Sequence, residues 1–581
     1  MVAGQGGRVK TPRHLLPRTI RALTALLLAV TAAGSALVVA QQPPAPEGSP
    51  NDFRKSTRRG PDDKRRARSH ENGPVRMGNR ILNLPLEVRT IDGSENNLTH
   101  PEWGAAEALF LRLTSSRYTD GVSSPSGEDR PSARAVSNAL AAQAEVTANR
   151  RGASDFLWQW GQFLDHDLDL TPVAEPVEPF DIPVPAGDPW FDPQGTGVAV
   201  IGLDRSFYEF EAGLREQVNE LTAYIDASNV YGSDTARASA LRANDGTGRL
   251  LTSAGDLLPF NTEGLPNAPT DHDPSFFVAG DFRANEQVGL LAMHTLFVRE
   301  HNYWAGVIGR SNPGLDGDVV YESARIIVGA EMQAITWREF LPILLGKRAL
   351  PRYSGYSPEV NAGIANEFAT AAYRVGHTML PPTLLRLDRR GREIDEGNLA
   401  LADAFFAPSR ITDEGGIDPL LRGMATQYAQ EIDPMVVDGI RNFLFGPPGA
   451  GGFDLASLNL QRGRDHGIGS YNQVRVDLGL KPARSFRDIT SNPDWQAQLE
   501  EVYGDVDLVD LWVAGLCEDH EEDAMVGETF FTILRDQFIR LRDGDRFWYQ
   551  NYLDAELQGL IERQTLATII RRNTDIGNEL Q

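Results

Sequence analysis

The stretch that decides the fold is Trp160-Gly161-Gln162-Phe163-Leu164-Asp165-His166-Asp167-Leu168-Asp169. If this stretch is a helix, positions i, i+3, i+4 and i+7 form one continuous stripe of Gln162, Asp165, His166 and Asp169. An amide, two carboxylates and an imidazole are poor core residues, because a buried charge is costly without a partner. Asp167 lies about 100° around the helix from His166, so it faces elsewhere. The pattern predicts a helix wedged between two bound groups.

Charge is uneven along the 581 residues. Residues 1–75 hold 13 Lys and Arg against 5 Asp and Glu, whereas the rest of the chain holds 43 against 75. Phosphate binding needs clustered Lys and Arg, so this acidity argues against nucleic acid as a partner. Cys517 is the only cysteine, which excludes an internal disulfide and a c-type haem attachment. Secreted animal proteins of this size usually carry several disulfides, so we expect a bacterial source.

Residues 1–40 have the features of an export signal. Five basic residues precede an apolar run from Ala22 to Ala40, which ends in a small residue. This order is typical of a secretory signal peptide, although a run of this length also fits a retained membrane anchor. We expect cleavage, no membrane span afterwards, and a secreted protein that is extracellular or periplasmic.

The rest of the chain divides simply. Residues 41–75 are rich in Pro, Arg, Asp and Ser and predict a disordered linker, with a basic anchor for anionic surfaces as the alternative. Residues 76–575 show mostly helical patterns and little strand-like alternation, so we expect one large, mainly α domain, then a tail over 576–581. The predicted helices are Asp155–Leu168, Gly289–Val307, Glu322–Leu345, Pro358–Val375 and Glu528–Arg542.

A second polar run follows in Leu221–Ser228, where Thr222, Tyr224, Asp226 and Ser228 alternate. An extended or looped chain presents alternate residues on one side. Hydroxyl, carboxylate and backbone carbonyl oxygens are the ligands that Ca²⁺ prefers. A polar turn before a strand has the same pattern, so both interpretations stay open at this point.

Three further segments carry polar groups. Arg283 and Glu286 are three residues apart and share a face if the segment is helical, a spacing that usually marks a surface ion pair. His294 and His301 are seven apart, which suits metal ligands or, more commonly, buried structural histidines. The predicted helix Pro358–Val375 leads to His377, and a histidine in that place is usually a core residue. The last segment, Leu458–Gly467, offers Asn459, Arg462 and Arg464 beside a Gly-rich turn.

Taken together, these segments resemble the animal-type haem peroxidases, the family that includes myeloperoxidase, lactoperoxidase and the peroxinectins. The resemblance covers about residues 76–575. Its motifs, in the family's order, are Trp160–Asp169, Thr222–Ser228, Gly280–Glu286, Arg374–His377, Leu458–Gly467 and Leu541–Trp548. One departure is that Ser94 and Glu95 stand where the family's opening motif has a cysteine.

The resemblance implies a haem b-derived cofactor held at His377, the proximal iron ligand. Asn459 is then expected to accept the proton of the other ring nitrogen, which fixes the tautomer, and Arg462 to pair a haem propionate. Gln287 stands where myeloperoxidase has a methionine bonded to a haem vinyl group. That third covalent link is therefore expected to be absent.

On the distal side, the resemblance implies that His166 is the catalytic histidine, acting first as general base and then as general acid. Arg283 is expected to stabilise developing charge, and Gln162 to order the distal water. Asp165 and Glu286 match the two carboxylates that become ester-linked to haem methyl groups in this family.

A calcium site is also implied by the resemblance, with Asp167, Thr222, Tyr224 through its carbonyl, Asp226 and Ser228 as ligands. Because Asp167 directly follows His166 in the chain, a bound Ca²⁺ is expected to clamp the distal helix.

The expected function is that of an exported haem peroxidase, with H₂O₂ and a small reducing substrate as its partners. Halides, thiocyanate or phenols are expected donors, oxidised through an oxoferryl intermediate. Two alternatives are a fatty-acid dioxygenase of the same superfamily and a Ca²⁺-dependent adhesion protein like the peroxinectins. The dioxygenases carry a radical-forming tyrosine three residues before the proximal histidine, where this chain has Arg374. The chain contains no Arg-Gly-Asp or Lys-Gly-Asp tripeptide.

Overall fold

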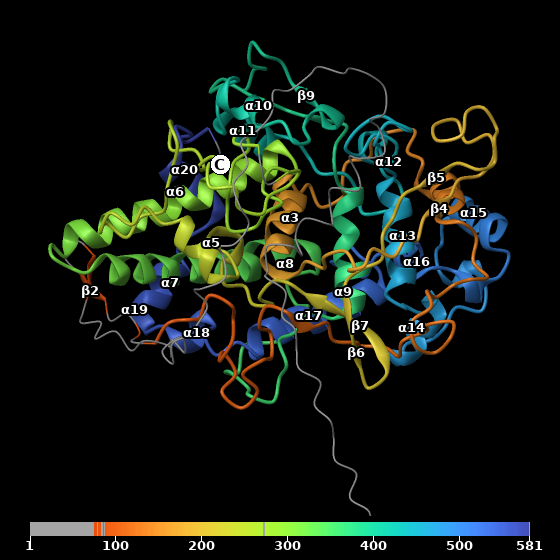
Figure 1. Ribbon diagram of the computed structural model, residues 1–581, viewed down its shortest axis with the longest axis horizontal. Coiled ribbons are helices and arrows are strands. Elements are labelled where there is room, and N and C mark those ends of the chain that lie inside the picture. The colour runs from red at the N-terminus through yellow and green to blue at the C-terminus, as the bar shows by residue number, and fades with distance from the viewer. Residues whose placement is uncertain (1–74, 78–79, 83–84, 86, 271–272, 580–581) are drawn as a thin grey trace, which may run out of the picture.

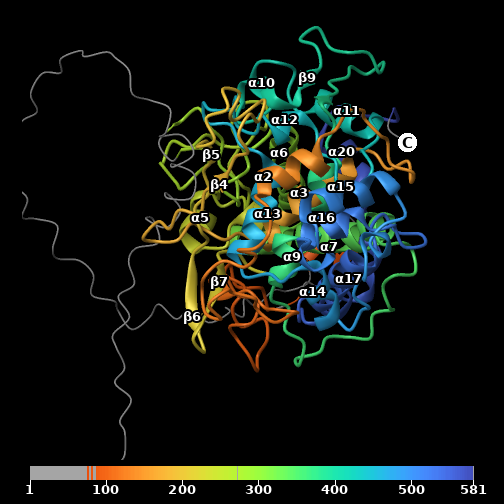
Figure 2. The same cartoon turned by 90° about the vertical axis from the view of Figure 1, so that its right-hand side faces the viewer.

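Helix α3 (Phe156–Leu168) lies near the middle of the molecule in both views (Figure 1, Figure 2). The computed structural model describes residues 75–77, 80–82, 85, 87–270 and 273–579, so the expected signal peptide and nearly all of the expected linker lie outside the described residues. Trp158, Trp160 and Phe163 are buried in the core, so α3 is anchored by large side chains while its polar stripe faces elsewhere.

Helices cover far more of the described chain than strands do, which confirms the prediction of a mainly α domain. The elements are α2 (Ala133–Val136), η3 (Ser137–Ala141), α3, α4 (Ser228–Tyr231), α5 (Thr235–Ala240), α6 (Val288–Ser311), α7 (Gly317–Ile335), η4 (Thr336–Phe340), α8 (Leu341–Leu344), α9 (Asn366–Thr370), η5 (Ala372–Thr378), η6 (Leu401–Asp403), α10 (Ser409–Thr412), α11 (Asp418–Thr426), α12 (Asp438–Arg441), α13 (Leu455–Asp465), α14 (Tyr471–Asp477), η7 (Phe486–Asp488), α15 (Pro493–Tyr503), η8 (Val506–Leu508), α16 (Leu511–Cys517), α17 (Glu528–Asp543), α18 (Tyr549–Tyr552), α19 (Ala555–Ile561) and α20 (Leu566–Asn573).

Strands are short and lie at the margins of the helical body. All pair antiparallel, and β3, β7 and β6 form a three-stranded sheet in that order. They are β1 (Val75–Met77), β2 (Arg80–Leu82), β3 (Ala108–Leu109), β4 (Ile182–Pro183), β5 (Val200–Ile201), β6 (Tyr208–Glu211), β7 (Leu214–Asn219), β8 (Thr383–Leu384) and β9 (Leu399–Ala400).

Four of the five predicted helices form. The one over Asp155–Leu168 becomes α3, and those starting at Gly289 and Glu528 become α6 and α17. The segment Glu322–Leu345 lies within a run of three consecutive elements, α7, η4 and α8, so it stays helical while its hydrogen bonding changes to a π turn in the middle.

The helix predicted over Pro358–Val375 is wrong. Only α9 and the 3₁₀ helix η5 form there, and they are separated by Ala371, whose φ of −136° is not helical. The preceding backbone bonds outside its own segment: Ile364 O accepts from Leu111 N at 2.8 Å, and Ala365 N donates to the Gln537 side chain at 2.8 Å. These long-range hydrogen bonds replace the i to i−4 bonds of a helix.

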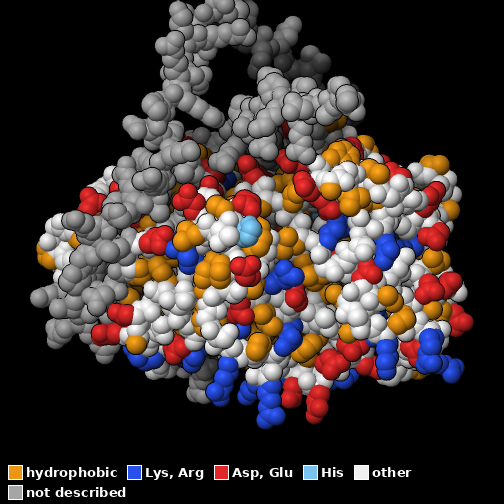
Figure 3. Space-filling view, turned by 90° about the horizontal axis from the view of Figure 1, so that it is seen from below, with side chains coloured by type: hydrophobic (Ala, Val, Ile, Leu, Met, Phe, Trp, Pro, Cys, Tyr) orange, Lys and Arg blue, Asp and Glu red, His pale blue; other side chains and the backbone are white. Residues whose placement is uncertain are grey.

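The core is continuous across the helices and includes the single cysteine. Cys517, at the end of α16, is fully buried, and burial raises the pKa of its thiol. Within residues 87–270 and 273–579, no helix combines the length and apolar character needed to cross a bilayer. The face seen from below mixes acidic and basic side chains with scattered apolar ones (Figure 3).

Candidate active site

A cavity of about 380 Å³ lies beside α3 and gathers side chains from distant parts of the chain. Apolar residues such as Phe340, Leu344, Phe405 and Leu458 form much of its wall. Seven residues with a predicted catalytic or cofactor-binding role also line it: Gln162, Asp165, His166, Arg283, Glu286, His377 and Arg462. A large, mostly apolar cavity with a few convergent polar groups is the usual form of a cofactor or substrate site.

The polar stripe of α3 faces this cavity, as its helical spacing predicted. Gln162, Asp165 and His166 all line it, whereas Asp167 does not. The helix ends at Leu168, so Asp169 is an extended capping residue that still reaches the cavity. The two-sided arrangement of the helix therefore follows from its periodicity.

His166 is buried against a carboxylate that the sequence analysis did not identify. Its Nδ1 lies 3.3 Å from Asp281 Oδ1, and its Nε2 lies 3.9 Å from Glu286 Oε2. Burial and the positive charge of Arg283 lower the pKa of His166 well below its usual value. The imidazole is therefore neutral and able to accept a proton.

Asp281 also holds Arg283. Its Oδ1 accepts from Arg283 N at 2.8 Å and Nε at 2.9 Å, and its Oδ2 accepts from Nη2 at 2.9 Å. Arg283 Nη1 donates to Asp165 at 3.4 Å, and Nη2 donates to the carbonyl of Asp169 at 3.1 Å. Residues 281–286 form turns rather than a helix, so Arg283 and Glu286 meet at the cavity through a turn and not through a shared helix face.

Burial shifts two carboxyl groups at the cavity toward their uncharged forms. Burial raises the pKa of Asp165, although Arg283 opposes the shift. Burial also raises the pKa of Glu286 to about 7. A desolvated carboxyl favours its uncharged form, so these two side chains are available to a bound group rather than fixed in strong ion pairs.

An amide chain fixes Gln162 in place. Its Oε1 accepts from Gln287 Nε2 at 3.0 Å, and the same nitrogen donates to Gln159 Oε1 at 2.6 Å. Gln287 also caps α6, because its Oε1 accepts from Gly289 N at 2.6 Å. A Cβ at Gly289 would stand 2.5 Å from Gln159 Oε1, so only glycine leaves room for this chain.

His377 enters the cavity from η5, and Asn459 of α13 lies behind it. Asn459 Nδ2 is 2.8 Å from His377 Nδ1, while Asn459 Oδ1 accepts from Arg374 Nη1 at 2.9 Å. A guanidinium only donates, so it takes the amide oxygen and leaves the amide nitrogen facing the ring. Acceptance of the ring proton by Asn459 needs the amide oxygen on the ring side, and it stays a prediction.

Arg374, named in the sequence only as part of the Arg374–His377 motif, is a second site residue for which no role was predicted. It lines the cavity three residues before His377, donates from Nε to Ala369 O at 2.8 Å, and makes no ion pair with any described carboxylate. Burial and the nearby Arg462 lower its pKa to about 10. Its place in the Arg-x-Gly-His motif was the signal that would have identified it.

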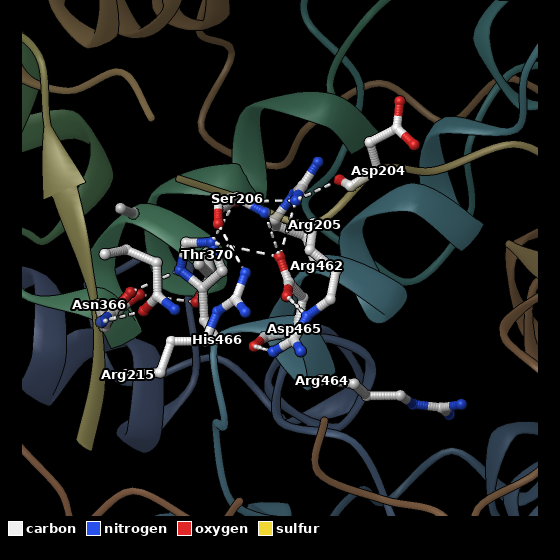
Figure 4. Close-up of polar contacts among 12 residues, drawn as sticks. Asp204, Arg205, Ser206, Arg215, Asn366, Thr370, Arg462, Arg464, Asp465 and His466 are labelled. Atoms are coloured by element: carbon white, nitrogen blue, oxygen red, sulfur yellow. Dashed lines mark hydrogen bonds and ion pairs between the residues drawn. The ribbon is translucent and has the colours of Figure 1, made fainter. Parts of the chain in front are cut away.

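Arg462 lies in a dense polar cluster beside the cavity (Figure 4). Its Nη1 donates to Asp465 Oδ2 at 2.8 Å and to Ser206 Oγ at 2.8 Å. Asp465 also accepts from Arg205 Nε at 2.6 Å, and Ser206 Oγ is 2.7 Å from His466 Nε2. One end of the Arg462 guanidinium is therefore held by the protein, which orients the side chain at the cavity wall.

The predicted calcium ligands gather on the other side of α3. Asp167 Oδ1 accepts from Ser228 Oγ at 2.9 Å, and Asp226 Oδ1 accepts from Thr222 Oγ1 at 3.1 Å. Tyr224 is buried in the same loop, and its hydroxyl donates to Trp103 O at 2.6 Å. Asp226 Oδ2 is buried without a hydrogen-bond partner, and burial together with Asp226 raises the pKa of Asp167 to about 8.

The paired histidines of α6 are structural. His294 Nδ1 contacts Asn229 O at 3.1 Å, and His301 lies between Tyr231 and Gly248, at 2.9 Å from each. Burial lowers the pKa of each to about 4. Over the described ranges, no three His, Cys, Asp or Glu side chains gather as a metal cluster.

Comparison with protein families finds one match over most of the chain. The model described as "Animal haem peroxidase" matches residues 88–581. Among curated proteins, the chain is 41% identical to peroxidasin of Drosophila melanogaster over 514 residues, which is 80% of this chain and 34% of that protein. The chain thus spans about a third of that peroxidasin's length.

Two other comparisons cover the relative more fully. The chain is 36% identical to peroxinectin A of Dictyostelium discoideum, over 84% of this chain and 93% of that protein. The solved structure of peroxidase A from Dictyostelium discoideum matches with a TM-score of 0.79 and 35% identity, covering 85% of this chain and 98% of that one. An Oryza sativa fatty acid alpha-dioxygenase matches with a TM-score of 0.71 and 21% identity, covering 84% of each chain, which shows a shared fold.

Proposed function

The chain belongs to the animal haem peroxidase family, and on that premise we propose that it is an exported peroxidase that uses H₂O₂ to oxidise small donors. The observation that carries the proposal is that His166, Arg283 and His377, which come from three separate segments of the chain, all line one cavity. Halides, thiocyanate and phenols are the proposed donors. Export rests on the basic and apolar order of residues 1–40.

The described residues fit a haem. Apolar side chains suit the macrocycle, and Arg374 and Arg462 at the cavity suit its two propionates. Asn459 lies at the Nδ1 side of His377, so Nε2 would be the nitrogen that binds iron. That role requires the ring proton on Nδ1, where the amide oxygen of Asn459 would accept it once haem is bound. Bound haem would supply the iron centre that takes the oxidising equivalents of the peroxide.

On the distal side, His166 would transfer the proton of H₂O₂ and Arg283 would stabilise the developing negative charge. His166 is neutral, so it can take a proton from H₂O₂ at a ring nitrogen and return it to the departing oxygen. Arg283 is fixed by Asp281, and its positive charge stabilises the negative charge that develops as the O–O bond breaks. Gln162, held by Gln287, is positioned to order the water between them.

Covalent attachment is proposed for the same cavity. Asp165 and Glu286 both line it, and burial raises the pKa of both carboxyl groups. We propose that each would form an ester with a haem methyl group, its oxygen replacing one methyl hydrogen while H₂O₂ takes the two electrons and two protons and leaves as water, so the bonds would accumulate with turnover. Gln287 has no sulfur, so a third link of the sulfonium kind is not expected.

A calcium ion is proposed beside Asp167. Asp167 and Asp226 are both buried, and Asp167 Oδ2 accepts from the backbone N of Asp226 at 3.1 Å. Asp226 also accepts from the hydroxyl of Thr222, and Asp167 from that of Ser228. The unpartnered Asp226 Oδ2 is the kind of buried oxygen that a cation satisfies. Tyr224 would contribute its carbonyl oxygen.

The dioxygenase alternative has less support at the site. The fold likeness to the Oryza sativa enzyme shows architecture alone at 21% identity. Tyr373 is buried four residues before His377 and its hydroxyl has no partner within the described chain. The position three before His377 is Arg374, which is bonded to Asn459.

The test is a turnover panel with the haem-loaded protein, using iodide, bromide, chloride, thiocyanate and guaiacol as donors. We expect H₂O₂-dependent oxidation of at least one donor and its near loss in His166→Ala. Oxygen uptake with linoleate in the absence of H₂O₂ is measured in parallel. Haem loading without oxidation of any donor would refute the peroxidase proposal, and linoleate-dependent uptake would favour the dioxygenase instead.

A further inference from the structure

A second and larger cleft lies toward the far end of α6. It has a volume of about 980 Å³ and is formed by α6, residues 249–257, the start of α11 and the end of α20. In Figure 1 these helices meet near the C-terminus. At 1.5 Å per residue, Arg310 in this cleft lies about 35 Å along the helix from Gln287 in the cavity. No residue lines both sites.

This cleft is basic although the chain carries a net charge of −24. Three of its charged side chains are acidic: Asp256, Asp418 and Asp575. Six are basic: Arg249, Arg299, Arg310, Arg389, Arg422 and Arg572. A local excess of positive charge on an acidic protein concentrates anions at that place.

Half of the arginines already have a carboxylate partner. Arg389 lies 3.2 Å from Asp575, and Arg422 lies 3.2 Å from Glu579. Arg572 lies 2.7 Å from the buried Glu300. Because these ion pairs compensate their charges, the three arginines contribute little to anion binding in the cleft.

The other three arginines have no such partner among the described residues. Arg249 and Arg310 are exposed and form no ion pair. Arg299 donates only to backbone carbonyls, at 2.8 to 3.0 Å from Asp256 O, Gly255 O and Asn573 O. A partly desolvated cation bonded only to neutral groups still favours a nearby anion.

One face of α6 arranges these groups in a row. Arg299, Tyr303, Gly306 and Arg310 follow one another at helical spacing, over about 16 Å. Tyr303 is 38% exposed, with Arg572 packed over its ring at 4.8 Å. Gly306 has no side chain, and the Arg310 guanidinium packs against it: a Cβ at Gly306 would stand 3.0 Å from Arg310 Nη1.

We propose that this cleft binds an acidic oligosaccharide. Guanidinium groups pair with carboxylate or sulfate in two-pronged hydrogen bonds, and the Tyr303 ring offers an apolar face for a sugar ring. The three aspartates accept hydrogen bonds from sugar hydroxyls. They also repel a compact, multiply charged phosphate, which makes a nucleotide or free phosphate a poorer fit.

The test is calorimetric titration of the full-length haem-loaded protein with a hexamer of galacturonic acid. Maltohexaose is the probe that has sugar rings without charge, and hexaglutamate is the probe that has carboxylates without sugar rings. We expect hexagalacturonate to bind at low salt, weakening as salt rises, and both other probes to bind at least about tenfold more weakly. Peroxidase turnover is followed separately, so the two proposals fail independently.

The variants separate the cleft from general charge. Arg249→Glu combined with Arg310→Glu is expected to weaken hexagalacturonate binding by about tenfold or more, and Tyr303→Ala to weaken it by a smaller factor. Arg487→Glu, an exposed arginine of η7, is the matched control and is expected to bind normally. Equal loss in the control, tight binding of hexaglutamate, or no binding of hexagalacturonate to a folded wild-type protein would each overturn the proposal.

Discussion

Asp165 and Asp167 are two residues apart on α3, yet their surroundings are opposite. The Asp165 side chain is 35% exposed to the cavity and has one contact, at 3.4 Å from Arg283. Asp167 is fully buried and accepts four hydrogen bonds, from Asp226 N, Ala227 N, Ser228 Oγ and Asn229 N. One helix therefore forms a wall between a side that leaves polar groups available and a side that fixes them.

The difference shows how a single helix can serve chemistry and stability together. A loosely held carboxyl can react or bind, whereas a carboxylate held from four directions positions the backbone around it. Because His166 lies between the two in sequence, its position depends on both sides. Four predictions test whether changes on the cavity side and changes on the Asp167 side affect different properties of the protein.

The largest effect is expected on the cavity side. His166→Ala removes the group that moves the proton, so kcat/KM for H₂O₂ is expected to fall by about 10²- to 10⁴-fold, while the calcium content stays unchanged. Stopped-flow kinetics and metal analysis measure the two. His520→Ala, a histidine outside the cavity bonded to Ile432 O, is the control. A fall of less than tenfold would contradict the assigned role.

The next effect is expected on the opposite side. Asp167→Asn removes one of the two buried carboxylates of the proposed calcium site, so the protein is expected to bind no calcium there and to lose about 2–3 kcal/mol of stability at saturating metal, with reduced activity following. Metal analysis and calorimetry check this. Asp155→Asn is the control, because Asp155 is a buried carboxyl at the start of the same helix. Full calcium content in Asp167→Asn would refute the site.

A smaller effect tests the connection made by Asp281. Asp281→Asn weakens its hold on Arg283 and removes a negative charge that raises the pKa of His166. We expect kcat/KM for H₂O₂ to fall by about tenfold and the acid limb of its pH profile to move to lower pH. An unchanged pH profile, with unchanged kcat/KM, would show that Asp281 is only a packing residue.

The smallest effect concerns pH and the stability of the haem-free protein. Burial raises the pKa of Glu286 from 4.5 to about 7, so the folded state binds more protons than the unfolded state between these values. Stability is therefore expected to fall as pH rises from about 4.5 to 7.

Glu286→Gln removes that titration, so its melting temperature is expected to vary less with pH over the same window, by a degree or two. Calorimetry at intervals of half a pH unit measures the difference. Glu501→Gln, at an exposed position of α15, should retain the wild-type slope. Identical slopes for Glu286→Gln and the wild type would show that Glu286 does not titrate in this range.

Much of this arrangement follows from local pattern. The spacing of Gln162, Asp165 and His166 predicts both the helix and the cavity face, because side-chain direction in a helix is set by its period. The identities of the bound groups came instead from resemblance to a family. Periodicity alone predicts which way the side chains point, but not which groups they bind.

The wrong helix prediction and the site residues without a predicted role have one physical cause, which is contact between residues far apart in the sequence. Pro358–Val375 has helical spacing, but its backbone bonds to Leu111 and Gln537, which no local pattern reveals. Asp281 becomes important only when the fold brings it to His166, more than a hundred residues earlier. Arg374 likewise acts through a distant residue, because it donates a hydrogen bond to the amide oxygen of Asn459, 85 residues later in the chain.

The burial of Cys517 bears on how long such a protein lasts in use. Thiolates, not thiols, react readily with oxidants, and this thiol is enclosed at the end of α16 with its pKa raised. The proposed peroxidase would therefore keep its one thiol, a side chain prone to sulfenic and sulfonic acid formation, away from the H₂O₂ that it uses. We expect its working lifetime to be limited by the cavity itself, and not by ageing of its only sulfhydryl.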